Sequence, residues 1–295
     1  MRTFCPRSIS NGMKYPIQEI PLKGFPSLLT EIPDKPKRLF LRGKLPHHGK
    51  ILSVVGARKY SPYGKDVCEK LIEGLSGFDI AIVSGLALGI DSIAHRAALN
   101  AGLYTLAIPG SGLSDSVLYP SLHKELAKKI LDSGGGLLSE FEPETKAAPW
   151  TFPQRNRIMA GISHATLVIE AEKKSGTLIT SRLATEYNRD VFTVPGSVFS
   201  KNSEGPHLLI RLGATPITTP EELLDALGFK KEEGQKREID CSPQEKKILE
   251  ILNVPLSRDE LIRQSKMSVS EANVLLSIME IKGLIEETMG EIRRT

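Results

Sequence analysis

Glycine, serine and basic side chains recur in this sequence directly after short apolar runs. The segments are residues 56–59, 84–89, 109–112, 170–177 and 195–197. Small residues let backbone N–H groups approach a ligand closely, and the N-terminus of a following helix adds partial positive charge. Arg58, Lys59, Lys173 and Lys174 add full positive charges. The pattern is typical of an anion site, and phosphate is the anion that suits it best.

The apolar runs before these segments predict the strands that position them. The runs span residues 51–55, 80–83, 104–108, 166–169 and 191–194. They are too short for helices and lack polar–apolar alternation, which is typical of parallel strands covered on both faces. Helices are expected near residues 62–76, 91–101, 121–133, 155–164, 177–188 and 220–227. This alternation predicts an α/β fold over residues 39–228, with an extended Rossmann-like, doubly wound and mostly parallel sheet whose loops share one crevice.

The flanking segments have different patterns. Residues 1–38 are punctuated by prolines, and we expect them to be an N-terminal extension that wraps the main domain. Residues 229–241 are almost wholly charged, which is typical of a solvated linker. Residues 242–295 contain three S-x-x-E capping boxes before apolar-periodic runs, and then a glycine-bounded segment that suits a β-wing. They predict a small winged-helix-like domain.

Composition and charge exclude several classes of protein. Three scattered cysteines, with no two at metal-ligand spacing, argue against a disulfide framework and a metal site. No apolar run approaches the ~18 residues that cross a bilayer, and the N-terminus lacks the apolar core of a secretory signal. Residues 1–238 carry 31 Lys and Arg against 25 Asp and Glu, whereas residues 239–295 carry 8 against 10. We therefore expect a cytoplasmic protein without a membrane partner, whose larger part meets the anion.

Familiar cofactor and catalytic motifs are absent from the sequence. Neither GLALGID nor PGSGLSD supplies the G-x-G-x-x-G of a dinucleotide site, and there is no GxxxxGK[ST] phosphate loop. The spacing shows no nucleophile–base pair, metal cluster or carboxylate dyad, so neither a cofactor nor catalysis is predicted. His95, four residues after Asp91 on an expected helix, is expected to form a local hydrogen bond.

Residues 149–158 combine aromatic and guanidinium groups. Arg155, Asn156 and Arg157 follow Trp150 and Phe152 closely. Guanidinium groups bind phosphate with two parallel hydrogen bonds, and aromatic rings stack on unpaired bases for about 1–3 kcal/mol each. The alternative is that the aromatic residues anchor the core while the arginines pair with Glu170 or Glu172.

The ordered set of motifs from residue 39 to residue 226 resembles the DNA-processing protein A family, DprA/Smf. The stretches are VVGARKYSPYG (54–64), SGLALGIDSIAH (84–95), IPGSGLSDSVLYP (108–120), LLSEFEP (137–143), FPQRNRIMAGIS (152–163), VIEAEKKSGTLIT (168–180), VFTVPGS (191–197) and GPHLLIRLGA (205–214). The resemblance implies sequence-independent binding of single-stranded DNA in natural transformation, protection of incoming strands, and loading of the RecA recombinase past single-strand-binding protein. It also implies a homodimer. Many members begin with a helical SAM-like domain, which this sequence does not show.

The resemblance and the loop pattern together define the candidate DNA-binding residues. The resemblance implies phosphate contacts from Arg58, Ser84, Gly85, Ser175, Gly176 and Lys124, and an RNR motif at Arg155, Asn156 and Arg157 that either touches DNA or braces the pocket. The loops add Lys59, Gly89, Gly110, Gly112, Lys173 and Thr177.

Two other functional classes compete with this hypothesis. A nucleotide-binding phosphoribohydrolase-like enzyme would use the same crevice, because Pro109, Gly110 and Glu170 loosely resemble its glycine-rich loop and glutamate. A transcriptional regulator would use the winged domain, but residues 268–282 offer two glutamates and only Lys282. We expect that domain to serve protein contacts or assembly rather than to bind duplex DNA.

Overall fold

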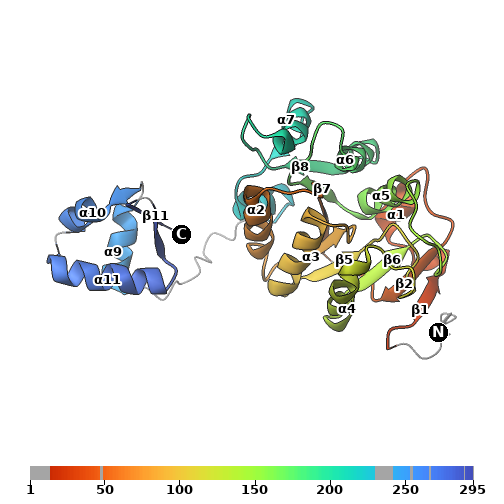
Figure 1. The fold of residues 1–295 in the computed structure, drawn as a ribbon, viewed down its shortest axis with the longest axis horizontal. Coiled ribbons are helices and arrows are strands. Elements are labelled where there is room, and N and C mark those ends of the chain that lie inside the picture. The colour runs from red at the N-terminus through yellow and green to blue at the C-terminus, as the bar shows by residue number, and fades with distance from the viewer. Residues whose placement is uncertain are drawn as a thin grey trace. The chain divides into compact units, whose positions relative to one another are not determined.

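A nine-stranded sheet crosses the first part of this computed structural model, which describes residues 14–46, 49–229, 242–252, 255–265, 267–288 and 290–294 (Figure 1). In spatial order the strands are β1 (Ile17–Ile20), β2 (Leu39–Gly43), β6 (Gly136–Ser139), β5 (Tyr104–Ala107), β4 (Ile80–Ser84), β3 (Lys50–Val55), β7 (Ala165–Val168), β8 (Asp190–Thr193) and β9 (Thr215–Pro216). All neighbours from β6 to β9 pair in parallel, and β2 pairs antiparallel with both β1 and β6. The predicted mostly parallel α/β sheet is confirmed.

The order of the strands reverses between β3 and β7. The chain runs outward from β3 through β4 and β5 to β6, then returns to pair β7 with β3 and continues to β8 and β9. This reversal is the topological switch point at which open α/β sheets bind ligands. Three of the predicted loops, residues 56–59, 84–89 and 170–177, leave strands on either side of it.

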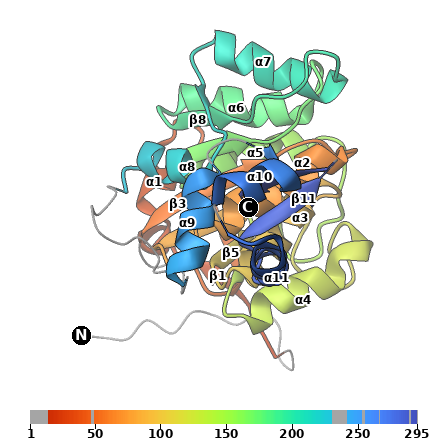
Figure 2. The same ribbon diagram turned by 90° about the vertical axis from the view of Figure 1, so that its left-hand side faces the viewer.

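Helices cover both faces of the sheet (Figures 1 and 2). One layer contains α2 (Pro62–Glu73), α3 (Ile90–Asn100), α4 (Lys124–Asp132) and α8 (Pro220–Ala226); the other contains α1 (Ser27–Glu31), α5 (Thr151–Ile162) and α6 (Gly176–Glu186). The remaining elements are α7 (Glu204–Arg211) and the 3-10 turns η1 (Leu22–Gly24), η2 (Ser121–His123) and η3 (Lys201–Ser203). Among the described residues, no helix is both long enough and apolar enough to span a membrane.

Strand β3 contributes to the apolar core on both faces, which explains why four of the five residues from 51 to 55 are apolar. Leu52 and Val54 pack into the core beneath α2 and α3, whereas Ile51 and Val55 pack into the core beneath α5. Neighbouring residues of a strand point to opposite faces, so a strand covered on both sides is apolar along most of its length rather than at alternate positions. This packing holds the loop after Val55 on a rigid support.

The structure differs from the sequence prediction in several places, and strand β6 and helix α7 are not among the predicted elements. Strand β1 pairs with β2, so residues 17–20 extend the sheet instead of only wrapping it. Helix α5 begins at Thr151, because the hydroxyl of that residue donates to the Gly110 carbonyl at 2.6 Å and holds the chain there. Phe229, expected in the linker, packs edge-on against Phe78 at a ring separation of 5.5 Å. The rest of the expected linker, residues 230–241, lies outside the described residues.

The second compact unit comprises residues 231–295. Its elements are α9 (Pro243–Ile251), α10 (Arg258–Ser265), α11 (Val269–Ile281), β10 (Leu256–Ser257), β11 (Ile285–Thr288) and β12 (Glu291–Arg294). Ser242 and Ser268 form complete capping boxes at the starts of α9 and α11. Leu261, Leu276 and Ile292 meet in a core of their own. The unit has the predicted arrangement of three helices with a small β-wing.

The buried His95 ring predicts a pH dependence of the stability. Its Nδ1 atom lies 2.7 Å from Oγ1 of Thr105, so its partner is on β5 rather than at Asp91 as the sequence suggested. Burial lowers the pKa of His95 to about 3, whereas the unfolded chain protonates this residue near pH ~6.5. The unfolded state therefore binds more protons in this window, and stability is lost as the pH falls from about 6.5 toward 3.

We expect His95→Asn to flatten the dependence of the unfolding free energy on pH across this range, as measured by urea denaturation at a series of pH values. His207→Asn, which alters a half-buried histidine, is the control. An unchanged slope in His95→Asn would contradict the assignment.

Candidate functional site

A cleft of about 490 Å³ opens at the switch point of the sheet. Its lining comes from the loop after β3, from Ala87 and Asp91 after β4, from the first two turns of α5 and from the start of α6. The charged lining residues are Arg58, Lys59, Arg155, Lys174, Asp91 and Glu172. Cations outnumber carboxylates by four to two, with Asp91 at the start of α3 and Glu172 on the loop after β7. The cleft therefore suits an anionic ligand.

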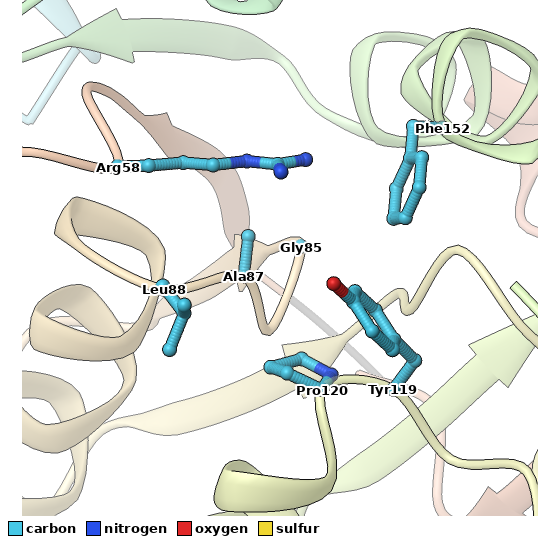
Figure 3. Close-up of a pocket in the computed structure, with 7 residues that line it drawn as sticks. All are labelled: Arg58, Gly85, Ala87, Leu88, Tyr119, Pro120 and Phe152. Carbon is cyan, nitrogen blue, oxygen red and sulfur yellow. The ribbon is translucent and has the colours of Figure 1, made fainter. Parts of the chain in front are cut away.

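Arg58 extends across a small pocket that adjoins this cleft (Figure 3). Its guanidinium carbon lies 5.2 Å from the centroid of the Phe152 ring, and Phe152 meets Tyr119 edge-on at 5.7 Å. A cation held over an aromatic face is oriented without being neutralised by a carboxylate. Arg58 is also exposed, so its charge remains available to a phosphate group.

A buried charged pair lies under the rim of the cleft. Arg155 is only 4% exposed, and its Nη1 donates to the carbonyl of Ile108 at 2.6 Å. Asp91 accepts hydrogen bonds from the backbone N–H groups of Gly85 and Ala87. Burial raises the pKa of Asp91 and lowers the pKa of Arg155 to about 10, while each charge favours the ionised form of the other. The pair braces the glycine loop from below.

Gly85 separates the two members of this pair. A Cβ atom at this position would lie 1.7 Å from Nη1 of Arg155 and 2.5 Å from Oδ2 of Asp91. Any side chain at position 85 would therefore clash with Arg155 and Asp91, and only glycine fits between them. The N–H of Gly85 bonds to Asp91, so this loop does not turn that amide toward a ligand as the sequence pattern predicted.

The start of α6 forms the opposite wall. Ser175 caps the helix by accepting from the Thr177 N–H at 3.1 Å, and the Thr177 hydroxyl donates to the Gly56 carbonyl at 3.2 Å. Asn156 donates to the Gly176 carbonyl at 3.3 Å. No atom lies within 4 Å of the position that a Cβ of Gly176 would occupy. The positive end of a well-anchored helix therefore opens onto the cleft.

The structure brings about half of the predicted residues together. Those that line the cleft or the small pocket are Arg58, Lys59, Gly85, Arg155, Asn156, Ser175, Gly176 and Thr177. Lys173 is exposed on the same loop as Ser175 but does not line the cleft, whereas the next residue, Lys174, does.

Four other predicted residues pack the loops rather than line the cleft. The Ser84 hydroxyl is buried and donates to the Val54 carbonyl at 2.6 Å. Gly89 has a φ of +89°, which favours glycine, and lets the start of α3 approach the Arg58 loop. A Cβ at Gly110 would meet the Phe152 ring, and one at Gly112 would meet the carbonyl oxygens of residues 142 and 143.

Arg157 and Lys124 lie outside the cleft lining. Arg157 pairs with Glu140 and also donates to the carbonyl of Asp34, which ties α5 to the N-terminal segment. Residues two positions apart on a helix point in nearly opposite directions, so Arg155 and Arg157 cannot share one face. Lys124 is exposed at the start of α4, next to His123, whose Nδ1 lies 2.7 Å from the Leu86 carbonyl.

The structure also decides between the alternatives for the aromatic residues and the arginines. Trp150 is 58% exposed and meets Phe141 edge-on at 5.6 Å, so it is not a core anchor. Glu170, offered as a partner for the arginines, instead accepts from the Ser61 hydroxyl and N–H group and from Asn202.

Sequence reasoning missed three contributors to the site. Asp91 was treated only as a neighbour of His95, Tyr119 was not considered, and Glu172 was considered only as a partner for arginine. A signal existed for Asp91, because it follows the SGLALG loop by two residues at the start of an expected helix. Tyr119 had no local signal, since only the path of the long loop after β5 brings it to Phe152.

The fold is a doubly wound α/β sheet with a basic, aromatic-edged cleft at its switch point, and the chain continues into a winged-helix unit. The chain belongs to the DNA recombination-mediator protein A family, whose model matches residues 19–228. A model of the DprA winged helix domain matches residues 232–291.

The chain is similar to several curated relatives. It is 42% identical to Protein Smf of Escherichia coli (strain K12) over 206 residues, which are 70% of this chain and 54% of that protein. It is 41% identical to the DNA processing protein DprA of Streptococcus pneumoniae over 218 residues, which are 73% of this chain and 76% of the relative. The chain thus spans about half the length of the E. coli relative.

Two solved structures share the fold. The X-ray structure of DNA processing protein A from S. pneumoniae aligns with a TM-score of 0.63 and 38% identity, covering 72% of this chain and 74% of that one. DNA processing protein A from Helicobacter pylori, whose structure concerns its single-stranded DNA binding mode, aligns with a TM-score of 0.64 and 27% identity, covering 72% of this chain and 95% of that one.

Proposed function

We propose that this protein binds single-stranded DNA without sequence preference in the cleft of its first unit, and that it acts as a recombination mediator. The observation that carries this proposal is the arrangement of Arg58 opposite the open start of α6, with Phe152 beside the guanidinium. The guanidinium and the helix start bind phosphate, and the aromatic edge contacts bases. The binding mode studied in the H. pylori relative supports the same ligand.

An unpaired strand suits the cleft better than a duplex. A ring such as Phe152 or the neighbouring Tyr119 stacks only on a base whose face is free, and base faces in a duplex are covered by their neighbours. The lining consists mainly of apolar side chains, cations and small residues, and the amide of Asn156 is used by the Gly176 carbonyl, so the lining offers no set of donors arranged for one particular base. Binding is therefore set by phosphate charge and stacking.

Salt titration of single-strand binding tests this proposal. Fluorescence anisotropy with labelled oligothymidylate should give an affinity that falls as salt rises, with a slope of log K against log salt of about −0.7 for each phosphate contacted. Unlabelled duplex and mononucleotides should compete weakly. An affinity that does not change with salt concentration, or duplex DNA that competes as well as single-stranded DNA, would contradict the proposal.

The fluorescence of Trp150 can report directly on DNA binding. It is the single tryptophan of the chain and is half-exposed two residues before Phe152. A base that stacks near this edge of the cleft changes the surroundings of the indole. We expect saturation with oligothymidylate to quench the tryptophan emission, and Trp150→Phe to abolish the signal. An unchanged emission spectrum at saturation, with binding verified by anisotropy, would show that the strand does not reach Trp150.

Membership of the family extends the proposal to partners. We propose that the protein protects incoming strands in natural transformation, works as a homodimer, and loads the RecA recombinase onto DNA covered by single-strand-binding protein. Adding the protein to such covered DNA should shorten the lag before RecA hydrolyses ATP. Light scattering should give twice the mass of one chain. A lag that is unchanged would overturn the loading role.

We propose that the cleft acts by binding rather than by catalysis. Glu170, the carboxylate on which a phosphoribohydrolase-like activity would depend, accepts from the Ser61 N–H at 2.9 Å and from Asn202 at 3.2 Å. Its oxygens thus hold two loops together. Incubation with nucleoside monophosphates should release no free base, and release of base would establish the enzyme alternative instead.

We propose that the second unit serves protein contacts or assembly. Helix α11 contains no lysine or arginine between Val269 and Ile281. Lys282, at its C-cap, donates to Glu245 at 2.7 Å. A helix that enters a DNA groove needs cations for the phosphates beside it. The full chain and residues 1–229 should therefore bind duplex DNA with equal, weak affinity; much tighter duplex binding by the full chain would contradict this role.

A further inference from the structure

Three exposed aromatic side chains lie next to the cleft and have no part in the function proposed above. The exposed fractions are 45% for Tyr60, 49% for Tyr63 and 96% for Phe199. Tyr60 continues the loop that carries Arg58, Tyr63 lies in the first turn of α2, and Phe199 lies on the loop between β8 and η3. These three residues are called the aromatic rim.

Direct contacts join the two segments that carry the aromatic rim, residues 58–63 and residues 195–203. The Tyr63 hydroxyl donates to the Pro195 carbonyl at 2.6 Å. Asn202 donates to the Lys59 carbonyl at 3.0 Å, and the same amide donates to Glu170 at 3.2 Å. Because Lys59 itself lines the cleft, the surface that carries the aromatic rim continues the cleft without an intervening element.

The charge of this surface matches that of the cleft. Lys59 and Lys201 are exposed on the two joined segments. Glu170 lies between the segments but is buried and hydrogen-bonded to both, so it presents no open carboxylate to the surface. After Lys201, the next exposed carboxylate along the chain is that of Glu204, at the start of α7. Exposed rings interleaved with lysines are typical of surfaces that follow an unpaired strand.

We propose that the aromatic rim is a second binding segment for single-stranded DNA, which the strand reaches by leaving the cleft past Lys59. This inference rests on the proposed function of the cleft. Bases stack on Tyr60, Tyr63 and Phe199, while Lys59 and Lys201 contact the intervening phosphates. Two copies of the chain meeting across this surface would bring like-charged lysines together, whereas a polyphosphate neutralises them.

The test compares two lengths of oligothymidylate, about four and about sixteen nucleotides, in the full chain. The short strand occupies the cleft alone, and the long strand reaches the aromatic rim. We expect the double variant Tyr60→Ala/Phe199→Ala, which removes two stacking rings, to weaken binding of the long strand by at least about fivefold to a hundredfold, the range for loss of a single base stack, and to leave the short strand unaffected.

Two further variants separate stacking from loop packing. Tyr63→Phe keeps the ring and removes the bond to Pro195, so long-strand affinity should be retained, whereas Tyr63→Ala should reduce it. Leu22→Ala, which alters an apolar side chain 64% exposed on η1, should change neither affinity.

Three outcomes would overturn the inference, and they are distinguishable. Equal losses for both lengths would place the effect in the cleft. A fall in oligomeric mass on light scattering of Tyr60→Ala/Phe199→Ala, without a length-dependent loss of affinity, would identify the aromatic rim as an interface between copies. Absence of binding by the unaltered protein to either length would reject the proposed function of the cleft itself.

Discussion

Arg58→Ala is expected to weaken the binding of every single-stranded sequence by about tenfold to a hundredfold. Arg58 is exposed, its guanidinium is held over the Phe152 ring at 5.2 Å, and it lines both the cleft and the small pocket. A charge-assisted hydrogen bond contributes about 1.5–3 kcal/mol, which corresponds to this range of affinity. Anisotropy titrations with oligomers of thymidylate, adenylate and cytidylate measure the effect.

The salt dependence separates a phosphate contact from other roles of Arg58. Losing one phosphate contact should make the slope of log K against log salt shallower by about 0.7, equally for all three sequences. Arg96→Ala removes an exposed arginine of α3 that does not line the cleft, and it should leave both affinity and slope unchanged. A loss confined to one sequence would show that Arg58 contacts a base rather than the backbone.

Gly85→Ala is expected to destabilise the first unit by about 3 kcal/mol or more. The added methyl group would lie 1.7 Å from Nη1 of Arg155, a buried side chain already fixed by the Ile108 carbonyl at 2.6 Å. Moving Arg155 breaks this hydrogen bond and weakens its attraction to Asp91; overpacking costs about 1–3 kcal/mol, and a buried charged group that loses its hydrogen bond costs about 1–3 kcal/mol or more. Thermal unfolding followed by circular dichroism should show a fall of about 6 °C or more in Tm.

Gly176→Ala is the matched control for this change. Gly176 belongs to the same rim, but the space that its Cβ would enter is open, and it starts a helix. We expect its stability to remain within about 1 kcal/mol of the unaltered protein. Equal Tm values for the two variants would show that the buried pair does not brace the rim.

The Arg58 and Gly85 variants distinguish residues that contact the ligand from residues that support the loops beneath them. Arg58 and the start of α6 face the cleft, and their loss should affect affinity more than folding. Arg155, Asp91 and Gly85 lie beneath them and hold the loop backbone in place. Substitutions of these supporting residues should therefore lower stability and affinity together.

Much of this architecture could be predicted from local patterns. The run at residues 51–55 is apolar at every position except Ser53 because β3 packs on both faces, and that property is visible in the sequence itself. Ser242 and Ser268 form the expected capping boxes because each box depends on residues only three positions apart. The crevice followed from strand order, since loops at the carboxyl ends of parallel strands share one rim.

Long-range contacts decided what local patterns left open. Gly85 and Gly176 are both glycines in short loops, yet the first is enclosed by Arg155 and Asp91 and the second is open. Nothing within a few residues of either glycine distinguishes them.

The sequence by itself determined the doubly wound sheet, the winged-helix unit and the rim on which the cations gather, because periodicity, capping and the alternation of strands with helices are local properties. Only the tertiary structure decided that Arg58 faces the cleft, that Arg155 supports it from below and that Arg157 pairs with Glu140. The physical reason is that the environment of a side chain depends on the elements packed around it, and those elements come from distant parts of the chain.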